Sequence, residues 1–163
     1  MPNDSTRARA CALLAVVLAT IALDQLSKWA VLSVLEMASR PPIDVTGFFQ
    51  LVLVWNHGVS FGMLQHEADY MPWFLMLVAI VISLVLTRLA MQSRWWLERL
   101  GYGLVIGGAL GNVIDRARYR AVVDFLHLHA GGYSWPAFNV ADAAICVGVA
   151  PLLWAMRRHP ATP

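Results

Sequence analysis

The residues of this sequence best suited to chemistry are two aspartates, Asp124 and Asp142. Asp124 shares one face of an alternating segment with Val122 and Leu126, so its carboxyl group needs a partner, a proton or a function there. Two carboxyl groups in a partly dry site split their pKa values, and one stays charged while the other keeps its proton. The charged group can activate water and the neutral group can protonate a leaving amine. This pair therefore predicts amide hydrolysis without a metal or a covalent intermediate.

Asp142 has a second interpretation. It follows Asn139 by three positions at the start of a predicted helix, the spacing of an N-cap with an acidic residue in the first turn. A cap does not require Asp124 as well. The pattern leaves the capping and catalytic interpretations open.

Two further polar groups lie in apolar surroundings. Asp24 and Lys28 are one helical turn apart and are expected to pair, either to orient a helix or to contact a site. Asn112, Asp115 and Arg116 close another apolar segment, where we expect a structural role with Asp115 ionised beside Arg116.

Other hydrolase chemistries have weaker support. The histidines never form the His-Glu-x-x-His motif, although His57, His127 and His129 leave a zinc site open as an alternative, because alternate strand positions can share a metal. Ser60 lacks a nucleophile elbow and an evident His-Asp partnership, and the chain has no P-loop. We predict neither a metal nor another cofactor.

These side chains must be positioned by membrane helices. The chain has 163 residues, of which 59% are hydrophobic and 13% charged, too apolar a composition for an ordinary soluble domain. A spanning helix needs about 20 apolar residues. Four segments qualify, at about 10–35, 70–90, 95–114 and 135–156, and we predict one membrane domain over residues 1–163. The dispersed arginines and net charge of +2 argue against a nucleic-acid partner.

The arginines also predict the topology. If the helices alternate, one side of the membrane receives Arg7, Arg9, Arg88, Arg94, Arg99, Arg157 and Arg158, and the other receives Arg40, Arg116, Arg118 and Arg120. Both termini are then cytoplasmic, and connections 36–69 and 115–134 face outward.

Smaller elements follow from local patterns. Segments 48–55 and 121–129 read as strands of a small sheet on the outer ends of the helices. Gly131 and Gly132 predict a turn before the fourth span. A face of glycines four residues apart, Gly103, Gly107 and Gly111, predicts close approach of a neighbouring helix.

Five short motifs, in this order, resemble the bacterial lipoprotein signal peptidases, also called signal peptidase II. They are DQLSK at 24–28, NHGVSFG at 56–62, GGALGNVIDR at 107–116, VVDF at 122–125 and FNVAD at 138–142. Each motif alone is weak, but their combination covers nearly the whole chain and is very specific.

The resemblance implies an aspartic endopeptidase that removes signal peptides from prolipoproteins by cutting on the amino side of a diacylglyceryl-modified cysteine. It assigns the catalytic dyad to Asp124 and Asp142. Matching positions that shape or line the site are Asp24, Lys28, Asn56, Gly108, Asn112, Asp115, Arg116, Asn139 and Ala141.

The resemblance also implies a mainly α membrane protein with four transmembrane helices, a small extracytoplasmic β-cradle and a short extracytoplasmic helix, placed here between Phe61 and Tyr70. The expected location is the bacterial inner membrane, with the active site toward the extracytoplasmic face. Expected partners are diacylglyceryl-modified prolipoproteins, membrane lipid and globomycin-type cyclic peptide inhibitors.

The alternative function is a small proton-coupled membrane transporter, because carboxylates in spans often mark proton pathways, and Asp24 with Lys28 is its best support. Against it, the acids gather toward one membrane face and the spans show no duplicated halves. A non-enzymatic assembly subunit would leave Asp124 unexplained.

Overall fold

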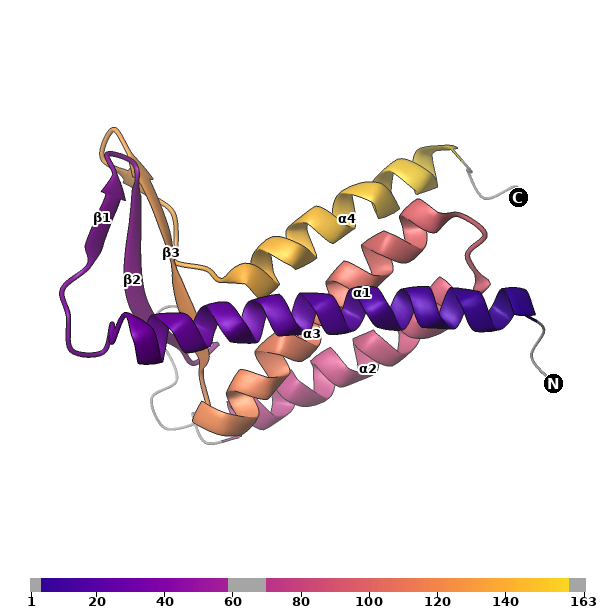
Figure 1. Ribbon diagram of the computed structural model, residues 1–163, viewed down its shortest axis with the longest axis horizontal. Coiled ribbons are helices and arrows are strands. Elements are labelled where there is room, and N and C mark those ends of the chain that lie inside the picture. The colour runs from indigo at the N-terminus through magenta and orange to yellow at the C-terminus, as the bar shows by residue number, and fades with distance from the viewer. Residues whose placement is uncertain (1–3, 59–69, 159–163) are drawn as a thin grey trace.

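The computed structural model describes residues 4–58 and 70–158, and this part of the chain contains four α-helices. They are α1 (Asp4–Trp29), α2 (Met71–Gln92), α3 (Trp96–Tyr119) and α4 (Val140–Arg158), and successive helices run in opposite directions (Figure 1). A five-residue π-helical segment, η1 (Ala30–Val34), extends α1. The prediction of a mainly helical protein with four long helices is confirmed.

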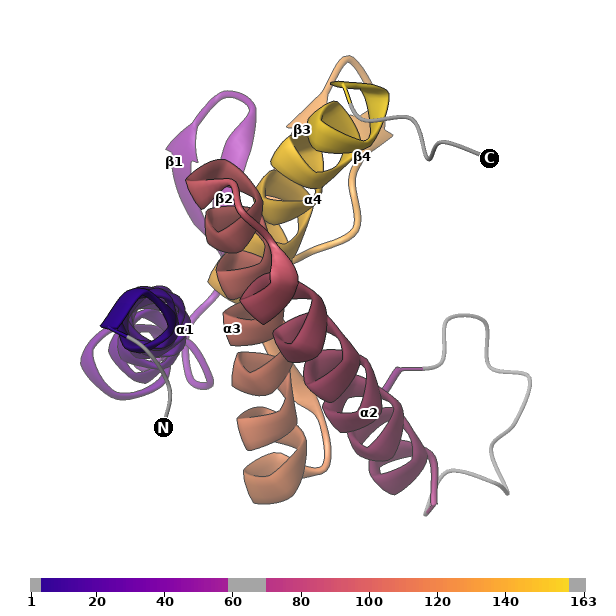
Figure 2. The same ribbon diagram turned by 90° about the vertical axis from the view of Figure 1, so that its right-hand side faces the viewer.

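Helix α3 is the centre of the bundle and packs against each of the other three helices (Figure 2). A Cβ on Gly103 would lie 2.7 Å from Val16 of α1, and one on Gly107 would lie 2.6 Å from Thr20. The predicted close approach along this glycine face is confirmed. Another face of α3 meets α4, where a Cβ on Gly101 would lie 2.6 Å from the Gly148 carbonyl oxygen.

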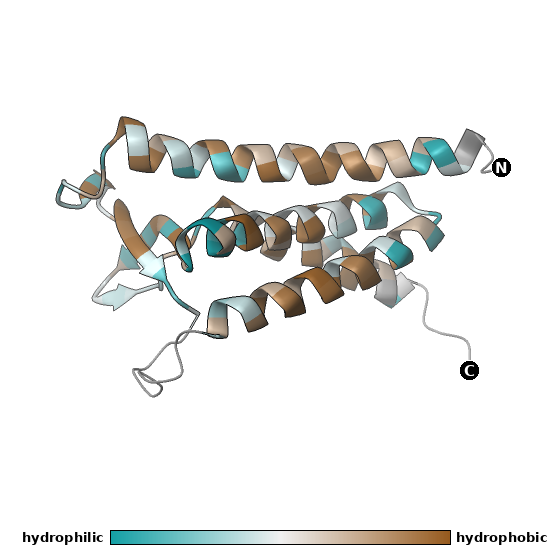
Figure 3. Cartoon of the chain, turned by 90° about the horizontal axis from the view of Figure 1, so that it is seen from below, coloured by the Kyte–Doolittle hydropathy of each residue, from teal (hydrophilic) through white to brown (hydrophobic). Residues whose placement is uncertain are grey.

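The helices consist largely of apolar residues, drawn in brown in Figure 3, and many of these side chains are exposed. On α2, Leu77 is 60% exposed and Leu84 is 67% exposed. Among the described residues, Thr6–Val34 and Met71–Gln92 are long and apolar enough to cross a membrane, and Val140–Ala155 is a shorter apolar helix. Exposed leucines on long helices are stable where hydrocarbon replaces water.

A small sheet stands across the end of the bundle where α1 ends and α4 begins (Figure 1). Its strands lie in the order β1 (Ile43–Thr46), β2 (Phe49–Asn56), β3 (Val122–Ala130), β4 (Tyr133–Ser134), and all pairs are antiparallel. The pairing of the two predicted strands, β2 and β3, is confirmed. Strand β1 was not predicted: its apolar alternation is limited to Ile43 and Val45, and only Ile43 is not exposed.

The helices have bounds that differ from those of the predicted spans. The third helix continues past Ile114 to Tyr119, and it ends where Arg120 adopts a left-handed conformation with φ of 58°. The fourth helix begins at Val140 instead of residue 135, because the backbone of 135–138 bonds to β3: Phe138 exchanges hydrogen bonds with Leu126 at 2.8 and 3.0 Å.

The predicted turn at Gly131 and Gly132 exists, but it joins β3 to β4 instead of leading directly into the fourth helix. Both glycines have positive φ, of 56° and 84°, which other residues rarely adopt. The helix predicted between Phe61 and Tyr70 lies outside the described residues except at its last position.

Candidate active site

Strand β3 places Asp124 at the junction of the sheet and the helices, where it is 1% exposed. Both of its carboxylate oxygens accept a hydrogen bond from a side-chain amide. Asn56 Nδ2 donates to Oδ2 at 2.9 Å, and Asn139 Nδ2 donates to Oδ1 at 2.7 Å. The amide of Asn56 is itself oriented by the Gly58 N–H, which donates to its Oδ1 at 2.8 Å.

Burial raises the pKa of Asp124 from 3.8 to about 6. The hydrogen bonds from Asn56 and Asn139 and the positive charge of Lys28 favour the charged form, but they only partly offset the loss of hydration. The nearby negative charge of Asp142 raises the pKa further. Asp124 therefore exchanges its proton near neutral pH, as a general acid or base must.

Asp142 lies in the first turn of α4 and forms a reciprocal cap with Asn139. The Asp142 N–H donates to Asn139 Oδ1 at 2.9 Å, and the Asn139 N–H donates to Asp142 Oδ2 at 3.2 Å. The capping interpretation is therefore confirmed. It does not remove Asp142 from the site, because its other oxygen accepts a hydrogen bond from Asn112 Nδ2 at 2.9 Å.

Asn139 links the two aspartates directly. Its side-chain Nδ2 bonds Asp124, its backbone N–H bonds Asp142, and the same Nδ2 also contacts Asn112 Oδ1 at 3.2 Å. Asn139 is completely buried. Neither carboxylate can move far without breaking a bond to this residue.

A buried ion cluster adjoins Asn139. Lys28 Nζ lies 2.8 Å from Asp24 Oδ2 and 2.7 Å from Asp115 Oδ2, and it donates to Asn112 Oδ1 at 3.2 Å. The predicted pairing of Asp24 with Lys28 is confirmed. Asp115 is engaged, as expected, but the cation that forms a salt bridge with it is Lys28, which α1 contributes from 87 positions earlier in the chain.

The ion cluster also holds the backbone around both aspartates. Asp115 Oδ2 accepts from the Val123 N–H at 3.1 Å, next to Asp124, and Asp24 Oδ1 accepts from the Ala141 N–H at 2.9 Å, next to Asp142. A buried carboxylate is thus satisfied by both a charge and a backbone donor.

Gln25 was missing from the predicted site residues, although it lies within the DQLSK motif. Its Nε2 donates to Asp115 Oδ1 at 2.9 Å and contacts Asp24 Oδ2 at 3.2 Å, so it bridges the two carboxylates that share Lys28. Its position in the sequence could have indicated it. Gln25 lies next to Asp24, and Lys28 on the same helix was already expected to pair with Asp24 inside the protein.

The remaining predicted residues adjoin the same cluster. A Cβ on Gly108 would lie 2.4 Å from the Ala141 carbonyl oxygen, so a side chain there would push α4 away. Arg116 Nη1 donates to the Asn112 carbonyl at 3.4 Å. The structure therefore brings together every residue that the sequence assigned to the site.

The zinc alternative gains no support from the described residues, in which three potential ligand side chains do not gather at any point. The two ring nitrogens of His127 instead contact Gln50 Oε1 at 3.2 Å and Ser134 Oγ at 2.6 Å.

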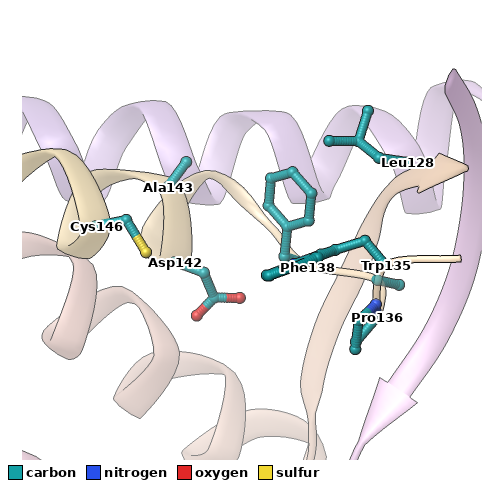
Figure 4. A pocket seen from close by; sticks show the side chains of 8 residues that line it. Leu128, Trp135, Pro136, Phe138, Asp142, Ala143 and Cys146 are labelled. Carbon is teal, nitrogen blue, oxygen red and sulfur yellow. The ribbon is translucent and has the colours of Figure 1, made fainter. Parts of the chain in front are cut away.

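A cavity of about 420 Å³ opens beside Asp142 (Figure 4). Apart from this aspartate its walls are almost entirely apolar. They are formed by Leu128, Trp135, Pro136, Ala137, Phe138, Ala143 and Cys146. An apolar ligand group in this cavity would lie directly against the Asp142 side chain.

Comparison with known proteins shows to which family the protein belongs. The family model described as signal peptidase (SPase) II matches residues 16–158. The chain belongs to the signal peptidase II family. It is therefore a protease, and this family is of the aspartic class.

Relatives of this signal peptidase II family member cover most of its length. The lipoprotein signal peptidase of Azoarcus sp. (strain BH72) is 48% identical over 143 residues, which is 86% of this chain and 79% of that one. That of Methylobacterium sp. (strain 4-46) is 46% identical over 140 residues, covering 86% and 85%. A bacterial membrane enzyme solved in meso at 1.9 Å has the same fold, with a TM-score of 0.76, 24% identity, and coverage of 88% and 91%.

Proposed function

We propose that the protein removes signal peptides from prolipoproteins by cutting on the amino side of a diacylglyceryl-modified cysteine, with Asp124 and Asp142 as the catalytic dyad. The observation that carries this proposal is the asparagine link between two carboxylates, one of which, Asp142, lines an apolar cavity. Membership of an aspartic peptidase family supports it independently.

In the proposed reaction the dyad holds one proton. The charged carboxylate takes a proton from water, whose oxygen attacks the carbonyl carbon on the amino side of the cysteine. The protonated carboxyl group donates to the nitrogen of the cysteine, the C–N bond breaks, and the signal peptide leaves with a new carboxyl terminus. The raised pKa of Asp124 supports a proton shared near neutral pH.

Asparagine amides have a distinct part in this scheme. Asn56, Asn112 and Asn139 each donate to a dyad oxygen and cannot themselves take a proton from it. They fix the directions of both carboxyl groups before substrate arrives, which lowers the entropic cost of an aligned attack.

The apolar cavity supports a lipid-modified substrate. We propose that it receives an apolar part of the substrate, or of a globomycin-type cyclic peptide inhibitor, and so holds the scissile bond against Asp142. An oriented bond then reacts within the complex instead of by repeated encounter.

We also propose that residues 1–163 form one integral domain of the bacterial inner membrane with four spanning helices, both termini cytoplasmic and the dyad toward the extracytoplasmic face. The start of α1 and the end of α4 lie at the same end of the bundle, while the sheet and Asp124 lie at the other (Figure 1). Seven arginines belong to the first end and four to the second, and this excess agrees with the positive-inside rule for a cytoplasmic side.

A proton-coupled transporter is not favoured by any observation. The buried acids Asp24, Asp115 and Asp124 form one cluster near the sheet instead of a relay along the bundle. The family comparisons support a peptidase and offer nothing for transport.

The test is cleavage of a diacylglyceryl-modified precursor by the purified protein in detergent, with the unmodified precursor in parallel. Asp124→Asn and Asp142→Asn are each expected to lose about 10² to 10⁴-fold in rate, because an amide cannot exchange the proton. The double variant should be hardly slower than either single variant, since the pair acts as one unit. Chelators should have no effect.

Asp44→Asn is the matched control, because Asp44 is an exposed carboxylate on β1 that also accepts a hydrogen bond from a side-chain amide. It should cleave at the wild-type rate. Substantial cleavage by a folded Asp142→Asn protein would return Asp142 to a purely capping role and direct the search for a second acid to Asp115.

A further inference from the structure

A second cavity lies at the end of the bundle opposite the dyad. It has a volume of about 410 Å³ and is lined by Arg94, Trp95, Trp96, Leu97 and Trp154. Residues 94–97 connect α2 to α3 and begin α3, whereas Trp154 comes from the last turns of α4 (Figure 1). Nothing in the proposed cleavage reaction uses this cavity.

The end of the bundle that carries the cavity is rich in positive charge. The helix ends on this side of the molecule carry Arg7, Arg9, Arg88, Arg94, Arg99, Arg157 and Arg158 in sequence, against the acids Asp4 and Glu98, and Arg94 lines the cavity itself. Glu98 accepts a hydrogen bond from the Ser93 hydroxyl, and Arg99 Nη1 donates to the Ser93 carbonyl at 3.1 Å. Arg94 is exposed and forms no ion pair with any residue in the described ranges.

The lining combines a phosphate-binding group with aromatic surface. Trp96 is 68% exposed and Trp154 is 51% exposed, and indole rings prefer the depth of lipid headgroups. A guanidinium group binds phosphate oxygens with two parallel donors. Basic pockets between helices on the cytoplasmic side suit acidic headgroups, because the positive charge is complementary to the phosphodiester.

We propose that this cavity binds the headgroup of an anionic phospholipid of the phosphatidylglycerol type in the cytoplasmic leaflet. Arg94 contacts the phosphodiester, and Trp96 and Trp154 pack against the glycerol and the first methylenes of the acyl chains. The inference rests on the membrane orientation proposed above but not on the cleavage reaction, since no residue of the dyad takes part.

Native mass spectrometry of the purified full chain in detergent tests the proposal. Phosphatidylglycerol and phosphatidylcholine with identical acyl chains are titrated separately, and phosphatidylglycerol should bind more tightly. Arg94→Gln should weaken its binding about fivefold. Arg88→Gln removes the same charge from an exposed position on α2 that does not line the cavity, and it should change binding less than twofold.

Trp96→Leu provides a second variant that keeps the charge and removes an exposed ring, and it should also weaken binding of phosphatidylglycerol. Equal losses in Arg94→Gln and Arg88→Gln would assign binding to diffuse charge and overturn the site. Equal affinity of the wild-type protein for both lipids, or displacement of phosphatidylglycerol by millimolar inorganic phosphate, would overturn it as well. Arg94→Gln should still cleave the precursor in detergent at the wild-type rate. A loss of lipid binding in this variant can then be told apart from a failure of the proposed function.

Discussion

At the scale of single residues, the cost of burying Asp124 is the feature with the clearest measurable effect. Its pKa is raised to about 6 by burial, so the folded protein binds a proton there more tightly than the unfolded chain does. Between about pH 4 and 6, the folded state therefore loses stability as pH rises. The shift corresponds to at most on the order of 2 to 3 kcal/mol.

We therefore expect Asp124→Asn to stabilise the protein at pH 7.5, because the neutral amide resembles the protonated acid, and to leave its stability nearly unchanged at pH 4. Thermal unfolding in detergent at the two pH values measures this. The exposed control Asp44→Asn should not show the difference. Equal stability of Asp124→Asn and wild type at pH 7.5 would mean that the carboxylate is better solvated than its surroundings imply.

The ion cluster yields a second prediction at this scale. One ammonium group satisfies two buried carboxylates, so removing it leaves two charges without a cation, whereas removing Asp24 leaves Lys28 paired with Asp115. Lys28→Met should therefore destabilise by about 3 to 5 kcal/mol and Asp24→Asn by clearly less. Unfolding midpoints in detergent compare them, and a milder effect of Lys28→Met would contradict the shared pairing.

How much of the site the sequence predicted depends on how local each contact is. The Asp24 and Lys28 pair and the Asn139 and Asp142 cap lie within one helical turn, so spacing alone identified them. The Lys28 and Asp115 pair joins two helices, and no local pattern indicates it. Sequence adjacency pointed to Arg116, whereas the salt bridge of Asp115 is with Lys28.

At the scale of elements, the difference between local and non-local contacts also explains why the observed helix boundaries differ from the predicted ones. Residues 135–138 are apolar like a span, but Pro136 lacks a backbone donor and Phe138 pairs with Leu126, so sheet bonding competes successfully with helix formation. Apolarity does not by itself separate an extended segment from a helix.

The contact between α3 and α4 predicts a strong effect at one glycine. A Cβ on Gly108 would lie 2.4 Å from the Ala141 carbonyl oxygen and 2.8 Å from Ile145. Gly108→Ala should destabilise by about 1 to 3 kcal/mol and lower kcat/KM, because displacement of α4 carries Asp142 with it. Unfolding midpoints and precursor cleavage are the measurements.

Gly47→Ala is the control for this substitution, since a Cβ at Gly47 has no neighbour within 4 Å. Gly47→Ala should behave as wild type in both measurements. Wild-type stability of Gly108→Ala would show that α4 can shift along α3 without cost, and the tight packing would then not be what positions Asp142.

At the scale of the whole molecule, the accessibility of introduced cysteines tests the proposed membrane orientation. The native Cys11 and Cys146 are first replaced by alanine, and one new cysteine is then introduced at each end of the bundle in turn. Tyr133→Cys lies on the β3–β4 hairpin, where the native side chain is 85% exposed, and should react with a membrane-impermeant thiol reagent in intact spheroplasts. Arg94→Cys, at the other end, should react only after permeabilisation. The reverse pattern would place the dyad on the cytoplasmic side.

The pairing of Asp24 with Lys28 within one turn also affects how the chain is made. Asp115 follows Asp24 by 91 positions, so at about 5 to 20 residues per second the ribosome delivers it roughly 5 to 18 seconds later. During that interval α1 must enter the bilayer without its partner helix. Because Asp24 and Lys28 neutralise each other within α1, this helix can be inserted before α3 is made. Insertion of α3 then adds Asp115 and completes the cluster that fixes the two aspartates.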